Sequence, residues 1–200
     1  MKICCIGRNY VAHAKELGNE VPTDPVIFLK PETALLQAPA SFIYPSFSND
    51  IHYECELVLR ICKEAKNVSA EEAANYYDAI TAGIDFTARD LQQKLKTKGL
   101  PWEKAKAFDQ SAVIGEWIAI PASPEIKFSL QKNNQTVQEG TTAHMIFNFN
   151  TIISHISAFF TLQPGDLIFT GTPAGVGPVA KGDILDGFIE NEQVFTLKVQ

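Results

Sequence analysis

Two acidic residues stand two positions apart in a stretch whose side chains alternate between apolar and polar types. The stretch runs from His52 to Cys62, and Glu54 and Glu56 belong to its polar set. On an extended strand, alternate side chains share a face, so the two carboxylates lie on one side with α-carbons about 6–7 Å apart. Burying two unpaired like charges at that spacing costs several kcal/mol. The face is therefore either exposed to water or holds a cation between the carboxylates.

A third acidic residue, Asp85, ends a run of apolar residues and admits two interpretations. Its side chain either caps a helix that begins near Thr87, or joins Glu54 and Glu56 as a ligand of a hard divalent cation. Mg²⁺ prefers oxygen ligands and keeps positions open for water and substrate. Three carboxylates would leave room for a bidentate ligand such as a 2-oxo acid. We interpret His52, beside the pair, as a packing or hydrogen-bonding residue rather than a ligand.

The composition is that of an ordinary globular chain. It has 200 residues, of which 46% are hydrophobic, and this is enough for one domain with a core that needs no disulfides. The net charge of −6 argues against broad binding to nucleic acid or to anionic membranes, because both require a basic face. No run has the length of a membrane span or of a secretory signal. The four cysteines lack the spacing of a zinc site, so we expect buried thiols and a cytoplasmic protein.

Strands dominate the elements that must position these residues. Apolar and alternating runs predict strands at 2–6, 26–29, 41–44, 52–62, 77–86, 112–120 and 166–170, two closing strands, and a hairpin that turns at Asn133–Asn134. Helical patterns are short, and they fall at 10–17, 69–76, 88–98 and 150–160. Helices and strands do not alternate regularly, so the sequence predicts an α+β fold, with one domain over residues 1–200.

Six short motifs follow one another along the chain. They are Gly7-Arg8-Asn9-Tyr10 with His13 and Glu16, Phe28-Leu29-Lys30-Pro31, Glu54-Cys55-Glu56-Leu57, Asp85-Phe86-Thr87-Ala88-Arg89-Asp90, Gly99-Leu100-Pro101-Trp102 with Ala105-Lys106-Ala107-Phe108-Asp109, and Gly171-Thr172-Pro173-Ala174-Gly175-Val176-Gly177. Together they resemble the fumarylacetoacetate hydrolase family, and most closely its short acylpyruvase and oxaloacetate decarboxylase branch. The motifs occur in the family's order and approximate spacing from about residue 2 to about residue 190. This agreement favours a metal site over a solvated face for Glu54 and Glu56.

The resemblance implies a mixed β-roll or β-sandwich, usually a homodimer, that acts on small 2-oxo acids through an enolate. It implies Mg²⁺ or Mn²⁺, with Ca²⁺ as a possible substitute, bound by Glu54, Glu56 and Asp85. His13 and Glu16 match a pair on a mobile helix that closes over the site. The other positions that match substrate-contacting residues of the family are Arg8, Lys30, Arg89, Gln92, Lys106 and Thr172.

The chemistry of these side chains agrees with that assignment. A cation chelated by the carboxylate and 2-oxo groups polarises the oxygen and stabilises an enolate. Hydrolysis of a C–C bond also needs a nucleophilic water, whose proton His13 could take while Glu16 orients its ring. Lys106 supplies positive charge for a carboxylate or a developing oxyanion, and Gln92 could donate a hydrogen bond. Decarboxylation needs no water, so the cation and Lys106 would suffice.

We therefore expect a metal-dependent acylpyruvate hydrolase, with oxaloacetate decarboxylation as an accompanying activity. One alternative is an isomerase or decarboxylase of ring-cleavage diacids, a branch that commonly has longer chains. Another is a binder of metal or small acids that has lost the reaction. The chain departs from the family pattern at His144, where relatives often carry an acidic residue, and this bears on the substrate rather than on the metal. We assign His144 and His155 structural roles.

Overall fold

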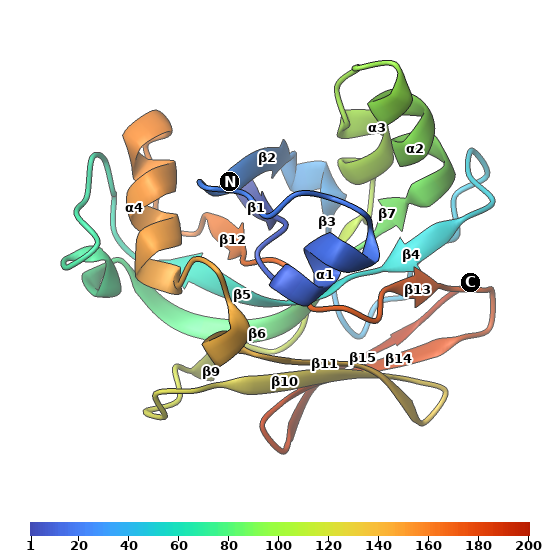
Figure 1. Cartoon of the computed structure of the whole chain (residues 1–200). Helices are drawn as coiled ribbons and strands as arrows, with labels where there is room; N and C mark the ends of the chain where they lie inside the picture. Colours follow the sequence, from blue (N-terminus) through green and yellow to red (C-terminus); the bar gives the residue numbers. More distant parts are fainter.

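The computed structural model describes residues 1–200 as three β-sheets with short helices at the periphery (Figure 1). The largest sheet has eight strands in the order β2-β1-β12-β5-β6-β8-β3, with β9 beside β6. Their bounds are β1 Ile3–Gly7, β2 Val26–Lys30, β3 Leu35–Gln37, β5 Cys55–Ile61, β6 Tyr77–Asp85, β8 Ala112–Ile114, β9 Ile118–Ala119 and β12 Leu167–Phe169. The α+β class predicted from the sequence is confirmed.

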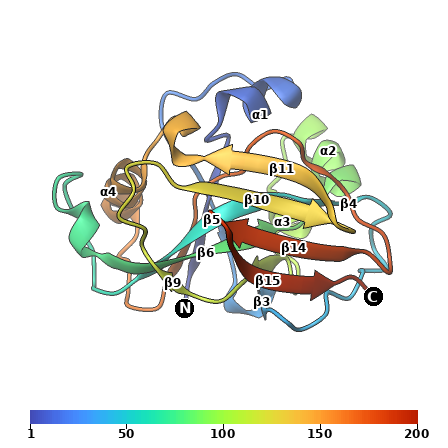
Figure 2. The same cartoon turned by 90° about the horizontal axis from the view of Figure 1, so that it is seen from below.

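Two smaller sheets complete the strand arrangement. The four-stranded sheet has the order β11-β10-β14-β15 and lies in front of the β5–β6 pair when the molecule is seen from below (Figure 2). Its strands are β10 Lys127–Lys132, β11 Gln135–Thr141, β14 Ile184–Ile189 and β15 Glu192–Lys198. The three-stranded sheet has the order β13-β4-β7, with bounds β13 Gly177–Pro178, β4 Ile51–Tyr53 and β7 Thr87–Ala88.

The main core lies between the large sheet and the four-stranded sheet. Leu57 and Leu59 of β5 are fully buried there in one cluster with Leu130 and Leu197 of the second sheet. Val58 points to the opposite face, where it belongs to a smaller cluster around β1 and β12. Because side chains alternate along a strand, Glu56 shares the face of Val58 and not that of the main core. This places its carboxylate on the side of the sheet that carries the helices.

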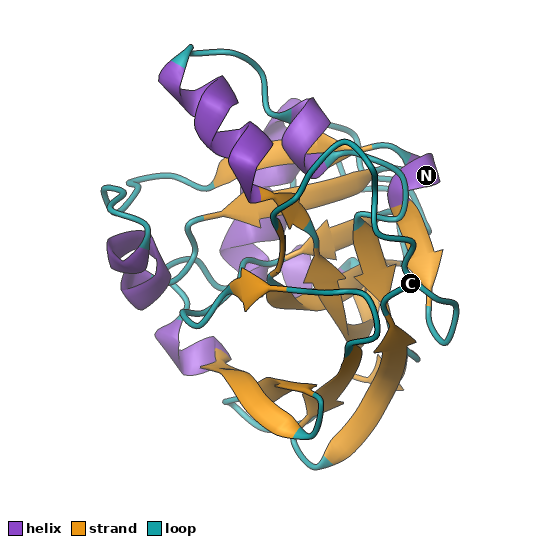
Figure 3. Cartoon of the chain, turned by 90° about the vertical axis from the view of Figure 1, so that its right-hand side faces the viewer, coloured by secondary structure: helices purple, strands orange, loops and turns teal.

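Helices lie outside the sheets, as the view coloured by secondary structure shows (Figure 3). They are α1 Val11–Glu16, α2 Arg89–Thr97, α3 Glu103–Lys106 and α4 Phe149–Phe159, with 3₁₀ turns η1 Glu32–Ala34, η2 Ala73–Asn75 and η3 Thr142–His144. The predicted helix at 150–160 is confirmed as α4, and the Asn148 side chain caps it by accepting a hydrogen bond from Thr151 N at 2.9 Å. None of the helices is long and apolar enough to cross a membrane.

Two predicted elements are wrong. The segment 69–76 forms turns and the single 3₁₀ turn η2 rather than a helix, because only Ala73 of that turn is buried and packing does not extend the first turn. The predicted strand at 41–44 does not form a regular ladder. Phe42 and Tyr44 instead make backbone hydrogen bonds with Lys198 and Gln200, the residues at the end of the chain.

Other predictions hold in a modified form. The hairpin between β10 and β11 turns at Asn133 and Asn134, whose φ values of 53° and 64° are those that asparagine tolerates. The predicted strand at 112–120 is divided into β8 and β9 around Gly115. A β-carbon at Gly115 would lie 2.5 Å from Val194 O, so the chain passes against β15 there with no space for a side chain.

Candidate active site

Three buried carboxylates meet at the edge between the large sheet and the three-stranded sheet. One oxygen from each of Glu54, Glu56 and Asp85 lies within 4.8 Å of the others. The three residues are only 5%, 2% and 1% exposed, so the interpretation of Glu54 and Glu56 as a solvated face is wrong. The capping interpretation of Asp85 is wrong as well, because α2 begins after Ala88 and no side chain caps it.

Strand pairing explains how distant parts of the sequence converge here. The antiparallel register of β5 and β6 sets Glu56 opposite Gly83 and Cys55 opposite Ile84. The backbone N–H of Asp85 then donates to the carbonyl of Glu54 at 2.8 Å. Glu54 itself occupies the single position between β4 and β5. The site therefore lies where the chain passes from one sheet to the other.

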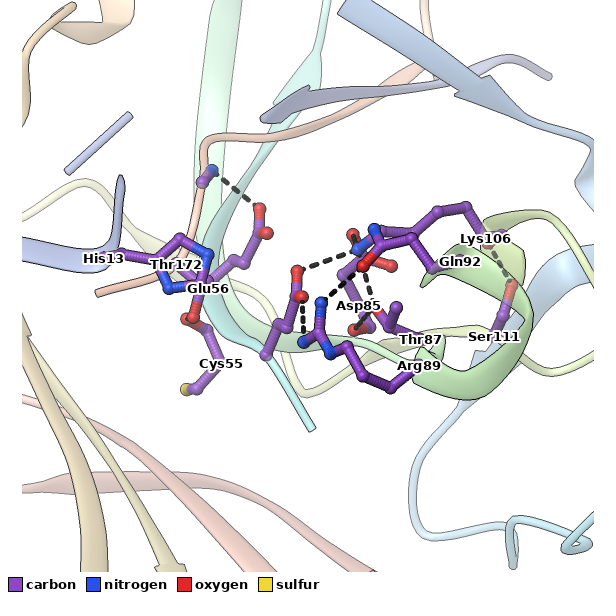
Figure 4. A network of polar contacts seen from close by, with 12 residues as sticks. His13, Cys55, Glu56, Asp85, Thr87, Arg89, Gln92, Lys106, Ser111 and Thr172 are labelled. Atoms are coloured by element: carbon purple, nitrogen blue, oxygen red, sulfur yellow. Dashed lines mark hydrogen bonds and ion pairs between the residues drawn. The ribbon is translucent and has the colours of Figure 1, made fainter. Parts of the chain in front are cut away.

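Cationic side chains neutralise two of the three acids (Figure 4). Lys106 Nζ lies 2.8 Å from Glu54 Oε2 and 2.7 Å from Asp85 Oδ2. Arg89 Nη2 lies 2.7 Å from Glu54 Oε1, and Lys30 Nζ lies 2.7 Å from Asp85 Oδ1. Burial raises the pKa of Glu54, but the charges of Lys106 and Arg89 outweigh it and hold the pKa below its ordinary value.

Glu56 has no such counter-charge. Its carboxylate accepts a hydrogen bond from the backbone N–H of Gly171 at 2.7 Å and forms none of the ion pairs of the chain. Burial and the neighbouring charges of Asp85 and Glu54 raise the pKa of Glu56 well above its usual range. A buried carboxylate without a cation, beside two others, is a donor set that fits a hard divalent metal ion.

His13 and Glu16 form a pair on α1. His13 Nδ1 lies 3.1 Å from Glu16 Oε2, and the other carboxylate oxygen of Glu16 accepts a hydrogen bond from Gly175 N at 3.0 Å. The His13 side chain is buried although α1 lies at the surface. Glu16 therefore both orients the imidazole and attaches α1 to the loop that follows β12.

The structure gathers most of the predicted residues around one pocket. Of the eleven site residues predicted above, all except Glu16 and Lys30 line it. Lys30 is fully buried behind Asp85, where its Nζ also donates to Ser111 O at 2.8 Å. Thr172 lines the pocket, but its hydroxyl already donates to Cys55 O at 2.8 Å and accepts from Gln138 Nε2 at 2.9 Å.

Three further polar residues, His52, Arg89 and Asp90, have partners outside the three-carboxylate cluster or on its rim. His52 bonds to Asp50 Oδ1 at 2.9 Å and does not reach the three carboxylates, as interpreted. Arg89 and Asp90 do not pair with each other: Arg89 reaches Glu54 and Gln92, whereas Asp90 accepts from Ser48 Oγ at 2.6 Å.

The sequence interpretation missed several residues of the pocket wall. Phe28, Trp102 and Lys96 line it, and Gln138 supports Thr172 from behind. Lys96 carried a usable signal, because it stands four residues after Gln92 on the same face of a predicted helix. Gln138 carried none, since a polar residue on an alternating strand gives no indication that it is buried.

The chain is similar to proteins that perform several reactions. It matches a family model described as fumarylacetoacetate (FAA) hydrolase C-terminal over residues 2–198. It is 41% identical to the oxaloacetate tautomerase YcgM of Escherichia coli, over 92% of this chain and 86% of that protein. Fumarylpyruvate hydrolase from Pseudomonas aeruginosa, crystallised with Mn²⁺ and pyruvate, superimposes with a TM-score of 0.93 at 36% identity, over 100% of this chain and 89% of that one. For 2-hydroxyhepta-2,4-diene-1,7-dioate isomerase from Mycobacterium marinum, the TM-score is 0.86 at 37% identity, over 99% and 73% of the two chains.

Proposed function

Because the chain belongs to the fumarylacetoacetate hydrolase family, we propose that it is a metal-dependent enzyme that enolises small 2-oxo acids, with oxaloacetate as the first candidate. The observation that carries this proposal is the buried carboxylate cluster in which Glu56 lacks a counter-charge. His13 and Lys106 line the pocket beside it. A 2-oxo acid held there meets a group that can take a proton and a group that can stabilise negative charge.

Glu54, Glu56 and Asp85 would hold the metal ion, for which we propose Mg²⁺, with Mn²⁺ as the alternative. When bound, the ion supplies Lewis acidity that favours an enolate. Lys106 places a fixed positive charge within 2.8 Å of two of these carboxylates, where it would stabilise negative charge that develops on a substrate oxygen held at the cluster. Arg89 is fixed by Glu54 and Gln92 at 2.7 Å each, which holds a second cation ready for the substrate carboxylate.

Tautomerisation requires that a proton leave the carbon beside the keto group and that one reach the oxygen. His13 is the proposed base for the carbon proton, because it lines the pocket and Glu16 fixes its ring. Lys106 is the proposed stabiliser of the oxygen. Loss of carbon dioxide from oxaloacetate needs the same stabilisation but no base, so it should depend on Lys106 more than on His13.

Acylpyruvate hydrolysis is the second candidate, and the His13–Glu16 pair favours it. A buried imidazole oriented by a carboxylate is the arrangement that activates a water for attack on a carbonyl. The similarity to a fumarylpyruvate hydrolase supports the same reading. Isomerisation of diene-dioates, the third reaction class, has support from the similarity to the Mycobacterium marinum isomerase.

The test compares substrates on one preparation of Mg²⁺-loaded protein. Loss of the ultraviolet absorbance of enol-oxaloacetate and of acetylpyruvate would be followed separately, with pyruvate formation measured enzymatically. We expect rapid ketonisation of enol-oxaloacetate and a fall of about 10²–10⁴-fold in His13→Ala. Oxalate binding should stay intact in that variant. Acceleration of neither reaction, with a ring-cleavage diacid consumed instead, would assign the chain to the isomerase class.

A further inference from the structure

The pocket contains a second group of positive charges that the chemistry above does not use. Lys96 and Arg8 both line it. Neither takes part in any ion pair of the chain. The polar contact of the Lys96 ammonium is a hydrogen bond to Asn19 Oδ1 at 3.2 Å, which leaves its charge unneutralised. Lys96 and Arg8 therefore differ from Lys106, Lys30 and Arg89, which are all paired with carboxylates.

Lys96 and the carboxylate cluster lie toward opposite ends of helix α2. Arg89, Gln92 and Lys96 are spaced by three and four residues, so they share one face of the helix, and all three line the pocket. Arg89 reaches Glu54, whereas Lys96 stands seven residues further on, which is about 10 Å along the helix axis. The helix thus places Arg89 beside the carboxylate cluster and Lys96 about two turns away from it, and both line the same pocket.

Arg8 occupies a strained backbone position. Its φ of 61° is left-handed, a conformation that is unfavourable for a residue with a side chain. The next residue, Asn9, keeps the chain there, because its side-chain amide donates to Phe147 O and Thr170 O and its oxygen accepts from Phe147 N, at 2.8–2.9 Å. A glycine would fit this position without strain, yet the chain carries an arginine that lines the pocket.

The two cations repel each other in the free protein. Burial lowers the pKa of Lys96, and the positive charges of Arg8 and Arg89 lower it further. Like charges gathered without a carboxylate between them are stabilised by an anionic ligand. Lys96 and Arg8 have no carboxylate partner, and they stand away from the carboxylate cluster. They could therefore bind a second negative group of a substrate whose first group lies at the cluster.

We propose that Lys96 and Arg8 form a second anion site, which binds the distal carboxylate of a 2-oxo diacid while its 2-oxo acid end lies at the carboxylate cluster. This inference rests on the proposed function, and among its candidates it favours diacids such as oxaloacetate over acylpyruvates whose acyl chain carries no charge. Phe28 and Trp102, which meet edge to face at a centroid distance of 6.3 Å, supply apolar wall for the carbon chain. Lys96 and Arg8 are then specificity residues for the diacid.

Tryptophan fluorescence gives a binding readout that needs no turnover, because Trp102 lines the pocket whereas the other tryptophan, Trp117, does not. Mg²⁺-loaded protein would be titrated with 2-oxoglutarate and with 2-oxopentanoate, which has the same carbon chain but a methyl group in place of the distal carboxylate. Oxalate, which has no distal group, serves as the reference ligand. We expect 2-oxoglutarate to bind at least about tenfold more tightly than 2-oxopentanoate, the range of a charge-assisted hydrogen bond.

Lys96→Gln should remove most of that preference and leave oxalate binding within about twofold of the original. Lys96→Arg should retain the preference, because it keeps the charge. Lys94→Gln, an exposed position on the same helix, is the matched control and should change none of the three affinities. With oxaloacetate as substrate, Lys96→Gln should raise KM and leave kcat nearly unchanged. Arg8→Gly, which removes the charge and relieves the backbone strain, should lose the same preference without loss of thermal stability.

The outcomes separate this inference from the proposed function. Equal binding of 2-oxoglutarate and 2-oxopentanoate by the original protein, with oxalate bound, overturns the second anion site and leaves the metal enzyme standing. An equal loss of all three ligands in Lys96→Gln also overturns it, since Lys96 would then act on the shape of the pocket. Failure of the original protein to bind oxalate in the presence of Mg²⁺ contradicts the proposed function itself.

Discussion

At the scale of single residues, Glu56 is the acid of the carboxylate cluster that has no counter-charge. Lys106, Arg89 and Lys30 supply positive charge to the other two acids, while Glu56 has a backbone N–H as its partner. A buried carboxylate in that position is costly when ionised, and burial beside two other acids raises its pKa. Among the three acids, ionised Glu56 is thus the least stabilised in the metal-free protein, and a bound cation would stabilise it the most.

In the Glu56→Gln variant, the stability of the protein should therefore no longer depend on the metal ion. In the original protein, saturating Mg²⁺ should raise the free energy of unfolding by a few kcal/mol, and a chelator should reverse it. In Glu56→Gln the melting temperature should be insensitive to both, and the metal-free variant should be at least as stable as the metal-free original. Glu20→Gln, at an exposed position, is the control and should keep the metal response. A metal response retained in Glu56→Gln contradicts the assignment of this ligand.

The pH dependence of metal affinity follows from the same residue. Burial and the charges of Asp85 and Glu54 raise the pKa of Glu56 above its usual range, and a metal ligand must be deprotonated, so metal binding at Glu56 competes with a proton. The metal-bound state holds fewer protons, and affinity must therefore rise with pH until the pKa of Glu56 is passed. Calorimetry of Mg²⁺ binding in two buffers with different ionisation enthalpies should show proton release at neutral pH. Binding without proton release would contradict a protonated Glu56.

At the scale of elements, the β5–β6 pair sets the positions of the carboxylates. Gly83 stands opposite Glu56, and a β-carbon there would lie 2.4 Å from Val113 O and 2.8 Å from Val58 Cγ2. The absence of a side chain lets β8 approach β6 closely just before Asp85. The geometry of the cluster thus depends on a residue that carries no functional group.

Gly83→Ala should displace β8 from β6 and cost about 1–3 kcal/mol of stability, the range for inserting a methyl group into a filled core. Because Asp85 follows two residues later on the same strand, metal affinity should fall as well. Thermal melting with and without Mg²⁺ measures both effects. Gly7→Ala, where the added atom would meet its nearest neighbour at 3.8 Å, should change the melting temperature little.

The strands and helices of the site differ in how far they could be predicted from the sequence. Alternation along 52–62 predicted that Glu54 and Glu56 share a side, and the apolar run before Asp85 predicted the end of a strand. Both predictions rest on patterns within a few neighbouring residues. That Asp85 N reaches Glu54 O depends on the register between two strands, which no local pattern encodes. The helix predicted at 69–76 failed because capping signals describe where a helix can begin, whereas its length depends on packing.

At the scale of the whole molecule, we propose that two copies of the chain associate, as the family resemblance implies. Light scattering coupled to gel filtration should then give twice the chain mass of 22.0 kDa. The measurement should be repeated with chelator, because a dimer that does not depend on the metal will keep its mass. A single-chain mass over the whole micromolar range would contradict the proposal.

The loop between β12 and β13 connects features that have been described separately. At one end, Gly171 N donates to Glu56; four residues later, Gly175 N donates to the acid that holds the imidazole on α1. A shift of the Glu56 carboxylate toward an arriving ion would pull on the same short segment that anchors the N-terminal helix. The five-residue segment from Gly171 to Gly175 therefore joins the uncompensated acid of the cluster to the pair that holds the imidazole, so that a change at either end is transmitted through the same backbone.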